Sequence, residues 1–500
     1  MGRRSFSAFA TVLLAFIVCG ATALTQETSI GREVSVPRHL QDGEEFTLSA
    51  KSLVEHGRAL FTAVWTSQEG GGRPLTKGTG NPVTDPTSPL LFPRNFNRIS
   101  APDANSCAGC HNDPAPGGAG DIVANVFVLA QTLDPVNPSV SGEFSNERNT
   151  LGMNGAGLIE MLAREMSAEL IATRNAAVEE AKRTGAPATR KLLAKGVSFG
   201  LITARPDGSV DTASVAGVNP DLIIRPFHQK GVVVSLREFS NNAFNHHHGM
   251  QSVERFGSGD PDADGVASEL TAGDITAVAV WQAALNIPGQ IIPSDPALAR
   301  AIIRGERTFG RVGCAECHVP ELELSSGVYS EPNPFNPVGN LRVQDVLHPF
   351  TFDLATDGPL PRPERAPDGR VFVRAFTDLK RHDLCDEELD HYCNEKIVQA
   401  GVSTRQFLTR KLWDAGNTAP YGHHGDLTML TEAIYWHGGE ARRSRNGFFA
   451  LSDHDRAEVI EFLKSLQILP EGTPGLVVDE TFHALSKAAV AASVDAEPID

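Results

Sequence analysis

The pentapeptide Cys107-Ala-Gly-Cys-His111 occurs a second time, with one change, as Cys314-Ala-Glu-Cys-His318. In this pattern two thiols bind the vinyl groups of one haem, and the His that follows binds its iron. With 7 Cys and 16 His in 500 residues, about 0.003 chance matches are expected. We therefore predict two covalently bound haems c, attached through Cys107, Cys110, Cys314 and Cys317, with His111 and His318 as proximal iron ligands.

A Cys pair for zinc or for redox chemistry is the alternative use of each motif. A tetrahedral zinc site needs a second thiol pair, and a thioredoxin-like site needs a strand and a helix around the motif. The sequence shows neither pattern beside these motifs. Haem attachment therefore remains the better interpretation.

The N-terminus has the three parts of a secretory signal. Residues 1–23 contain Arg3 and Arg4, an apolar run from Ala8 to Val18, and the small-residue site Ala21-Thr-Ala23. The run is shorter than the roughly 20 residues that span a bilayer. We expect cleavage after Ala23, a periplasmic location and no stable membrane insertion. The net charge of −17 argues against a nucleic-acid partner.

Export also fits the cysteines, because haem attachment and disulfides both belong outside the cytoplasm. Apart from Cys19 in the signal and the four haem thiols, only Cys385 and Cys393 remain. They lie in the charge-rich segment from Arg381 to Glu395, and we expect a disulfide between them. Two free buried thiols are the alternative.

The surroundings of the two motifs repeat as well. Gly57-Arg-Ala-Leu-Phe61 lies in a predicted helix over Leu48–Trp65, and Gly305-Glu-Arg-Thr-Phe309 lies in a helix that leads into the second motif. Each unit ends in a predicted helix with a hydroxyl N-cap, Thr271 or Ser452. We therefore expect a tandem duplication of helix, haem site and closing helix.

The predicted fold class is mainly α, with two tandem cytochrome-c-like domains and long loop insertions. We place a leader at 24–47, an N-terminal haem c domain at 48–290, a C-terminal haem c domain at 295–470 and a flexible tail at 471–500. Within the insertions we expect helical segments at 155–174 and 176–183, strands near 222–226 and 231–235, and loop from Val319 to Lys380.

Several segments together resemble a known family. Thr418-Ala-Pro-Tyr-Gly-His423-His-Gly, then Leu430-Thr-Glu-Ala-Ile and His437, is similar to the C-terminal motif of bacterial dihaem cytochrome c peroxidases. More closely, the first haem motif, 146–150, 155–160 and 436–441 resemble the dihaem c-type oxidoreductases, a family of peroxidases and thiol oxidoreductases. The resemblance implies two haems c, peroxide as oxidant and a periplasmic electron donor such as a small cytochrome or cupredoxin.

The resemblance also implies a second axial ligand for haem two, the haem on His318. The peroxidases usually place a Met at the end of the helix after Thr418–Gly425, and His437 stands there in this chain. We predict His318–Fe–His437 ligation. Replacing Met by His lowers the reduction potential of a haem, because a thioether favours the ferrous state.

Haem one, the haem on His111, has no comparable partner nearby, since no His lies between His111 and His228. It is either five-coordinate or bound by a remote residue, for which His246-His247-His248 is the obvious source. A surface or propionate-contacting role for that run is the alternative. The full set of candidate ligands is Met153, His246, His247, His248, Met250, His423, His424, Met429 and His437.

The resemblance implies two further roles, and the tryptophans of the sequence suggest a third. Glu160 stands where the peroxidases carry a distal carboxylate that moves a proton between the oxygens of a bound peroxide. An exposed Glu paired with Arg164 is the alternative. Thr418 and Pro420 match positions whose carbonyls hold calcium between the haems. Trp281, Trp413 and Trp436 are candidates for assisting electron flow, or simply core residues.

We therefore expect a peroxidase-like enzyme that reduces peroxide at haem one and receives electrons through haem two. Oxidation or oxygenation of an organic or thiol substrate is the second hypothesis. The third is an electron carrier without a substrate, in which both irons have two protein ligands.

Overall fold

The computed structural model describes residues 30–72, 104–120, 124–126, 146–260, 264–395 and 398–496. The predicted signal peptide and most of the segment between Gly70 and Ser106 lie outside these residues. Among the described residues, no helix has the length and apolar content needed to cross a membrane.

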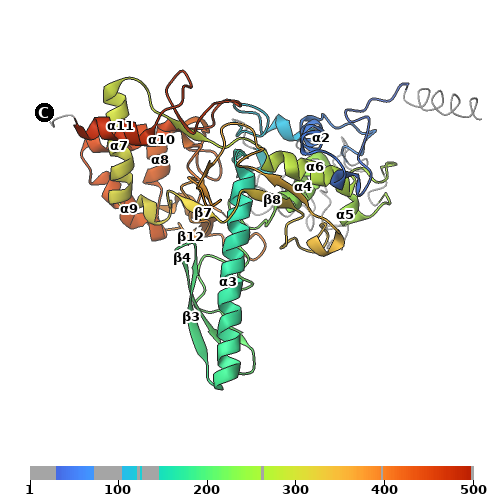
Figure 1. Cartoon of the computed structure of the whole chain (residues 1–500), viewed down its shortest axis with the longest axis horizontal. Helices are drawn as coiled ribbons and strands as arrows, with labels where there is room; N and C mark the ends of the chain where they lie inside the picture. Colours follow the sequence, from blue (N-terminus) through green and yellow to red (C-terminus); the bar gives the residue numbers. More distant parts are fainter. Residues whose placement is uncertain are drawn as a thin grey trace, which may run out of the picture.

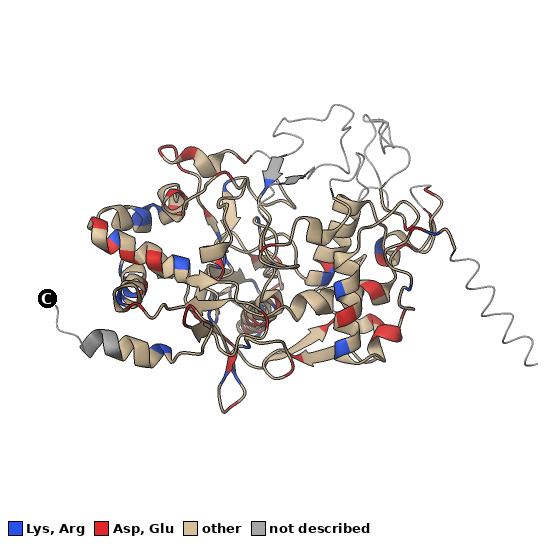
Figure 2. Ribbon diagram, turned by 90° about the horizontal axis from the view of Figure 1, so that it is seen from above, with Lys and Arg blue, Asp and Glu red and all other residues tan. Residues whose placement is uncertain are grey.

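Two helix pairs carry the repeat that the sequence predicts. In the first pair α2 (Ala50–Thr62) packs on α6 (Ala272–Ala283), and in the second α7 (Pro296–Arg311) packs on α10 (Asp453–Ser465). The pairs lie at opposite ends of the long axis, with the small strands between them (Figure 1). Acidic and basic residues are interspersed on the helices at both ends (Figure 2).

The repeated glycines mark the point where the helices of each pair cross. A Cβ on Gly57 would lie 2.0 Å from the carbonyl oxygen of Ala277, and one on Gly305 would lie 1.9 Å from that of Glu458. Only a residue without a side chain allows this approach. The repeated Gly is therefore a packing requirement of the helix pair that leads into each haem motif.

The closing helices have the predicted caps. The Thr271 side chain accepts a hydrogen bond from the Asp274 amide, and the Ser452 side chain accepts one from the Asp455 amide. Asp274 also accepts hydrogen bonds from His39 and His56 at 2.7 and 2.8 Å. The described part of the leader is therefore held against α6 and is not a free arm.

The prediction of a mainly α fold made of tandem cytochrome-c-like domains is wrong. Helices account for 36% and strands for 15% of the residues, and the strands form several small sheets. The largest apolar core joins residues on both sides of the predicted boundary, from Val36 to Trp413. Each haem motif keeps its helix pair, but the insertions contribute strands and a shared core that a loop-only reading excludes.

Short strands occur throughout the insertions. The sheets are β1 (Ala124–Val126) with β2 (Asn146–Arg148), β3 (Ala188–Ala194) with β4 (Val197–Ala204) and β5 (Val210–Asp211), β7 (Leu322–Leu324) with β11 (Val371–Val373) and β10 (Glu364–Arg365), β8 (Val328–Glu331) with β9 (Phe350–Asp353), β12 (Arg381–Asp383) with β13 (Gln406–Leu408), and β6 (Gly289–Ile291) between β14 (Leu466–Gln467) and β15 (Val477–Val478). All described pairs are antiparallel except β6 with β15.

The remaining helices are short, apart from α3 (Ala156–Thr184). They are η1 (Glu44–Phe46), η3 (Cys107–Gly109), α4 (Leu236–Ala243), the π-helix η4 (Phe244–His248), α5 (Val253–Phe256), η5 (Cys314–Glu316), η6 (Val343–Asp345), η7 (Asp390–Cys393), η8 (Ala415–Asn417), α8 (Leu430–Tyr435), η9 (Gly439–Ala441), α9 (Arg442–Phe449) and α11 (Lys487–Ala496).

The helix α3 joins the two helical segments that the sequence predicts into one helix of 29 residues. Its first half is buried, and its second half extends from the body beside β3 and β4 (Figure 1). The strands expected near 222–226 and 231–235 are absent from the described chain there, which forms only an isolated bridge between Phe227 and Val233. Conversely, the segment expected as loop, 319–380, contains β7 to β11.

Candidate haem sites

Each CxxCH motif forms one turn of 3-10 helix between the two helices of its pair in the sequence, and the second turn follows α7 directly. The turn is η3 in the first motif and η5 in the second, and the four cysteines are half-buried. The ring of Phe61 lies 6.2 Å from that of His111, and the ring of Phe309 lies 6.3 Å from that of His318. The two motifs therefore share the same local geometry down to an aromatic contact.

The proximal imidazoles are oriented by backbone carbonyls. His111 Nδ1 lies 3.3 Å from the Gly118 oxygen, and His318 Nδ1 lies 3.1 Å from the Phe376 oxygen. Burial lowers the pKa of both rings to about 4, so both are neutral at pH 7. When Nδ1 donates to a carbonyl, the lone pair on Nε2 is left for a metal. Both residues fit the role of axial haem ligand.

His437 faces His318 across a gap that suits an iron. Their ring centres are 6.4 Å apart, and His437 Nδ1 donates to the Ala433 oxygen at 2.6 Å. Two imidazoles bound to opposite sides of one metal at about 2 Å have ring centres roughly 6 Å apart. Burial also lowers the pKa of His437. The end of α8 thus presents a neutral, oriented imidazole where the sequence predicts the second axial ligand.

The remote His run lies at the first motif. It forms the π-helix η4, and π-helical turns are often found at functional sites. His248 Nε2 lies 3.2 Å from Cys107 Sγ, and its Nδ1 donates to the Ala104 oxygen at 2.7 Å. His247 is close enough to His111 and His228 to lower the pKa of both, after the larger effect of burial. The fold therefore places η4 and His248 against the first motif.

Glu160 is fully buried in α3 and is held by an ion-pair network. It pairs with Arg164, accepts from the Leu236 amide at 2.7 Å and accepts from Asn333 Nδ2 at 2.8 Å. Burial raises its pKa, against the effect of Arg164. The pairing with Arg164 is confirmed, and the expectation of an exposed Glu is wrong. The proton-transfer role of Glu160 stays a prediction.

The other candidates occupy varied places. Met153 and Met250 belong to the large core, whereas Met429 is 55% exposed. Trp281 packs against Phe61 with ring centres 4.4 Å apart. Trp413 lies in the same core, and Trp436 stacks on His391.

A buried polar cluster lies near His437 and combines the candidate ligand His423 with a lysine that the sequence does not single out. His423 is 4% exposed, stacks on Tyr392, and has no hydrogen-bond partner within the described residues for either ring nitrogen. Burial and the neighbouring His424 and Arg148 hold its pKa far below the usual range. Lys230 lies beside it, and burial lowers the pKa of that ammonium to about 7. The family motif names His423, but no sequence pattern signals a buried Lys.

The Asn149 side chain lies at the predicted calcium position, although the sequence did not predict it as a ligand. Asn149 Nδ2 donates to the Pro420 carbonyl at 2.6 Å. The buried Oδ1 of Asn149 lacks a hydrogen-bond partner within the described part of the chain. Amide and main-chain carbonyl oxygens are the ligands that calcium prefers. These oxygens fit a calcium site that joins β2 to the Thr418–Gly425 segment.

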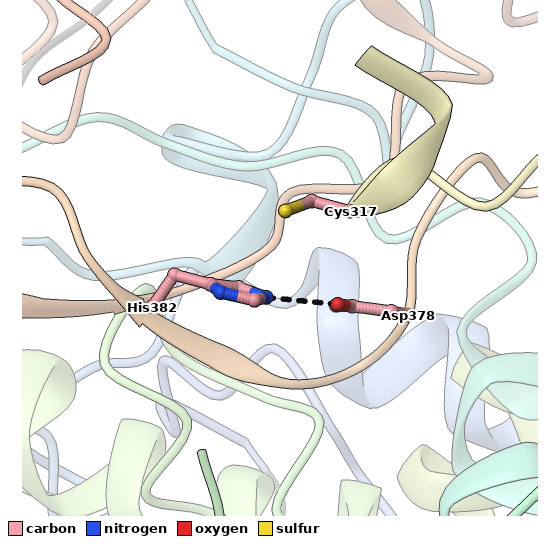
Figure 3. Close-up of side chains that lie close together, drawn as sticks. All are labelled: Cys317, Asp378 and His382. Carbon is pink, nitrogen blue, oxygen red and sulfur yellow. Dashed lines mark hydrogen bonds and ion pairs between the residues drawn. The ribbon is translucent and has the colours of Figure 1, made fainter. Parts of the chain in front are cut away.

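A second cluster, Cys317, Asp378 and His382, has donor atoms within 4.8 Å of one another (Figure 3). His382 contacts Asp378 through Nε2 and Glu440 through Nδ1, both at 2.8 Å. These carboxylates outweigh burial and raise the pKa of His382 to about 10. An imidazole that donates from both nitrogens is no metal ligand. The cluster is therefore better described as an ion pair beside a haem thiol.

The expected disulfide is present between Cys385 and Cys393. It closes a short loop that contains η7 and follows β12. Arg405 donates from Nη2 to the Cys385 carbonyl at 2.7 Å. The loop lies beside the residues that follow α8, close to His437.

Comparison with known proteins supports the resemblance. Residues 366–466 match a family model described as "Di-haem oxidoreductase, putative peroxidase". No curated protein matches the sequence. A solved structure that matches is hydrazine synthase of Kuenenia stuttgartiensis pressurized with 20 bar xenon, at 14% identity and a TM-score of 0.36, over 93% of this chain and all of that chain. The matched residues contain the Thr418–Gly425 segment and His437, and both haem motifs lie before them, so the chain is similar to this family over that part.

Proposed function

We propose that this protein is a periplasmic peroxidase with two covalently attached haems that have different tasks. Cys314, Cys317, His318 and His437 would hold haem two, which would supply electron transfer. Cys107, Cys110 and His111 would hold haem one, which would supply the site of peroxide reduction. A haem iron supplies the redox chemistry when bound, and an open sixth position is what admits a small oxidant.

The proposal rests on a difference between the surroundings of His318 and those of His111. His437 is buried, neutral and aimed at His318 from a ring-centre distance of 6.4 Å. The neighbours of His111 are instead a mixed set in which His248 is already bound to Ala104 and lies against Cys107. A haem iron bound by two imidazoles suits electron transfer. An iron bound only by His111 would keep a position for the substrate.

The protein side chains supply orientation and protons. Carbonyl contacts fix the tautomers of His111, His318 and His437, so each ring needs little reorganisation to bind a metal. Reduction of hydrogen peroxide to two waters consumes two electrons and two protons. Glu160 is our candidate for proton transfer, and its raised pKa is in keeping with an acid.

The remaining parts of the proposal concern partners and location. A cleaved signal peptide would deliver the chain to the periplasm, and a small cytochrome or cupredoxin would donate electrons. Calcium would bind near Asn149, Thr418 and Pro420. The orphaned oxygen of Asn149 supports the calcium site.

The electron-carrier hypothesis is favoured by one observation, the 3.2 Å contact of His248 with Cys107, because it brings η4, which also carries His247, against the first motif. If His247 binds the iron of haem one, both haems have two protein ligands and peroxide has no site. The two functions therefore differ in the spin state of one haem.

Electron paramagnetic resonance and optical spectra of the ferric holoprotein separate them. The peroxidase predicts one high-spin and one low-spin haem, with rapid spectral change on adding peroxide and turnover with a reduced donor. Two low-spin haems that do not respond to peroxide, before or after partial reduction, would exclude the peroxidase. A His247→Ala variant that then gains a high-spin haem would identify the closing ligand.

A further inference from the structure

The segment that carries His437 is covered by a single loop. This loop, 382–393, begins with the last two residues of β12, His382 and Asp383, and its part from Cys385 to Cys393 is closed by a disulfide. The covered segment, 436–442, starts at the end of α8 and includes η9. Both segments lie within the part of the chain that the structure describes.

Ring contacts connect the loop to the ligand itself. The ring of Tyr392 meets that of His437 edge-on at 6.1 Å, and the ring of His391 stacks on that of Trp436 at 5.4 Å. Tyr392 is buried and directly precedes Cys393. The His437 imidazole is therefore in ring contact with a residue next to the disulfide.

Polar contacts hold the residues after His437. Asp386 Oδ2 accepts from the Gly439 amide at 3.2 Å, and the Asp386 carboxylate pairs with Arg442. One residue further on, Glu440 accepts from the Asp383 amide at 2.9 Å. The loop thus grips the backbone of the covered segment on the C-terminal side of the ligand.

The two residues after His437 must be glycines for this contact to form. A Cβ on Gly438 would lie 2.6 Å from Asp386 Cβ, and one on Gly439 would lie 2.2 Å from the Asp383 oxygen. Gly439 also has a positive φ of 52°. Any side chain at Gly438 would push the loop away. The loop therefore packs against Gly438 and Gly439 at a distance that leaves no room for a side chain.

We propose that the disulfide-closed loop 382–393 is a positioning clamp for His437, and that opening or displacing it weakens the bond between His437 and the iron of haem two. The proposal rests on the proposed function, in which His437 is that ligand. α8 has only six residues and ends at Tyr435, so the helix alone fixes His437 poorly. Cross-linking the loop limits the conformations that the ligand segment can adopt.

The test uses the holoprotein with the double variant Cys385→Ser/Cys393→Ser, which leaves no lone thiol to interfere with haem attachment. We expect two bound haems, a high-spin fraction at haem two, and faster amide exchange in residues 430–442. Added imidazole should restore the low-spin spectrum and bind about tenfold more tightly than to wild type. A spectrum and imidazole affinity equal to wild type would overturn the clamp.

A second variant keeps the disulfide and serves if the first does not load haem. Gly438→Ala should give the same high-spin fraction and the same imidazole rescue. Asp211→Asn, which breaks the exposed Arg205–Asp211 pair on β5, is the matched control and should leave haem two unchanged. A low-spin Gly438→Ala protein would also reject the clamp.

His437→Gly tests whether His437 is the ligand independently of the clamp. Loss of the low-spin signal, with rescue by imidazole, shows that His437 is the ligand, and the clamp variants then test only the loop. An unchanged low-spin signal in His437→Gly would instead reject the ligand assignment and the clamp with it.

Discussion

At the scale of single residues, Glu160 shows how burial makes protein stability depend on the partners of a charged side chain. Its three described partners satisfy the carboxylate inside the protein, and Glu331 brings a second acid close to the same Arg164. Such a network is sensitive to the loss of one member, because the remaining charge is then buried without compensation.

Glu160→Ala should therefore destabilise the protein by about 3 to 5 kcal/mol, since Arg164 would be left in the interior without its main counter-charge. Chemical denaturation of the holoprotein measures this. Arg190, whose exposed ion pair with Glu180 lies near the C-terminal end of α3, provides the control: Arg190→Ala should cost less than about 1 kcal/mol. Glu160→Gln distinguishes catalysis from structure, because loss of peroxide turnover at preserved stability would support the proton-transfer role.

At the scale of elements, the crossing of each helix pair gives a direct prediction. Gly305→Ala should destabilise the protein by about 1 to 3 kcal/mol, because the new methyl meets the Glu458 carbonyl. Gly310→Ala in the same helix has open space and should stabilise it by about 0.5 to 1 kcal/mol. Thermal melts of both variants measure the contrast. Equal effects would mean that α7 and α10 do not cross at Gly305.

The contact between the leader and α6 predicts a pH dependence. Hydrogen bonds from His39 and His56 outweigh burial and lower the pKa of Asp274 to about 2, and Asp274 in turn raises the pKa of His39. Asp274 therefore contributes stability above its unfolded pKa that is lost as pH falls towards 2. His39 contributes stability below its unfolded pKa that is lost as pH rises through its folded pKa.

Melting temperatures of wild type and Asp274→Asn across pH 3 to 9 check this. The difference between the two proteins should be largest near pH 5 to 6 and should shrink towards both ends. A constant difference would show that the Asp274 contacts do not titrate as described.

At the scale of the whole molecule, the candidate calcium site joins distant parts of the chain through Asn149 and Pro420. Calcium at 100 times its Kd should stabilise the folded protein by about 2.7 kcal/mol. The melting temperature should rise on adding calcium and fall with a chelator, and Asn149→Ala should abolish that response. A wild-type protein whose melting temperature ignores both additions has no such site.

The sequence predicts local features well because they depend on neighbouring residues. The N-caps of the two closing helices and the Cys385–Cys393 disulfide have short spacings that the structure confirms. Strands of two to four residues, such as β7 and β8 to β11, leave too little periodicity to recognise. β3 and β4 are longer, but their buried and exposed positions do not alternate strictly, so the sequence lacks the pattern of a half-buried strand there. The fold class was wrong because those strands and the shared core depend on long-range packing.

The sequence by itself determined that two CxxCH turns follow two helices with repeated glycines, since covalent spacing and helix contacts need only nearby residues. Only the tertiary structure decided what faces each imidazole. The facing of His318 and His437, the approach of His247 to His111, the burial of Glu160 and the grip of loop 382–393 on Gly438 join segments far apart in the chain. Such contacts arise from packing of the whole fold, and no local pattern specifies them.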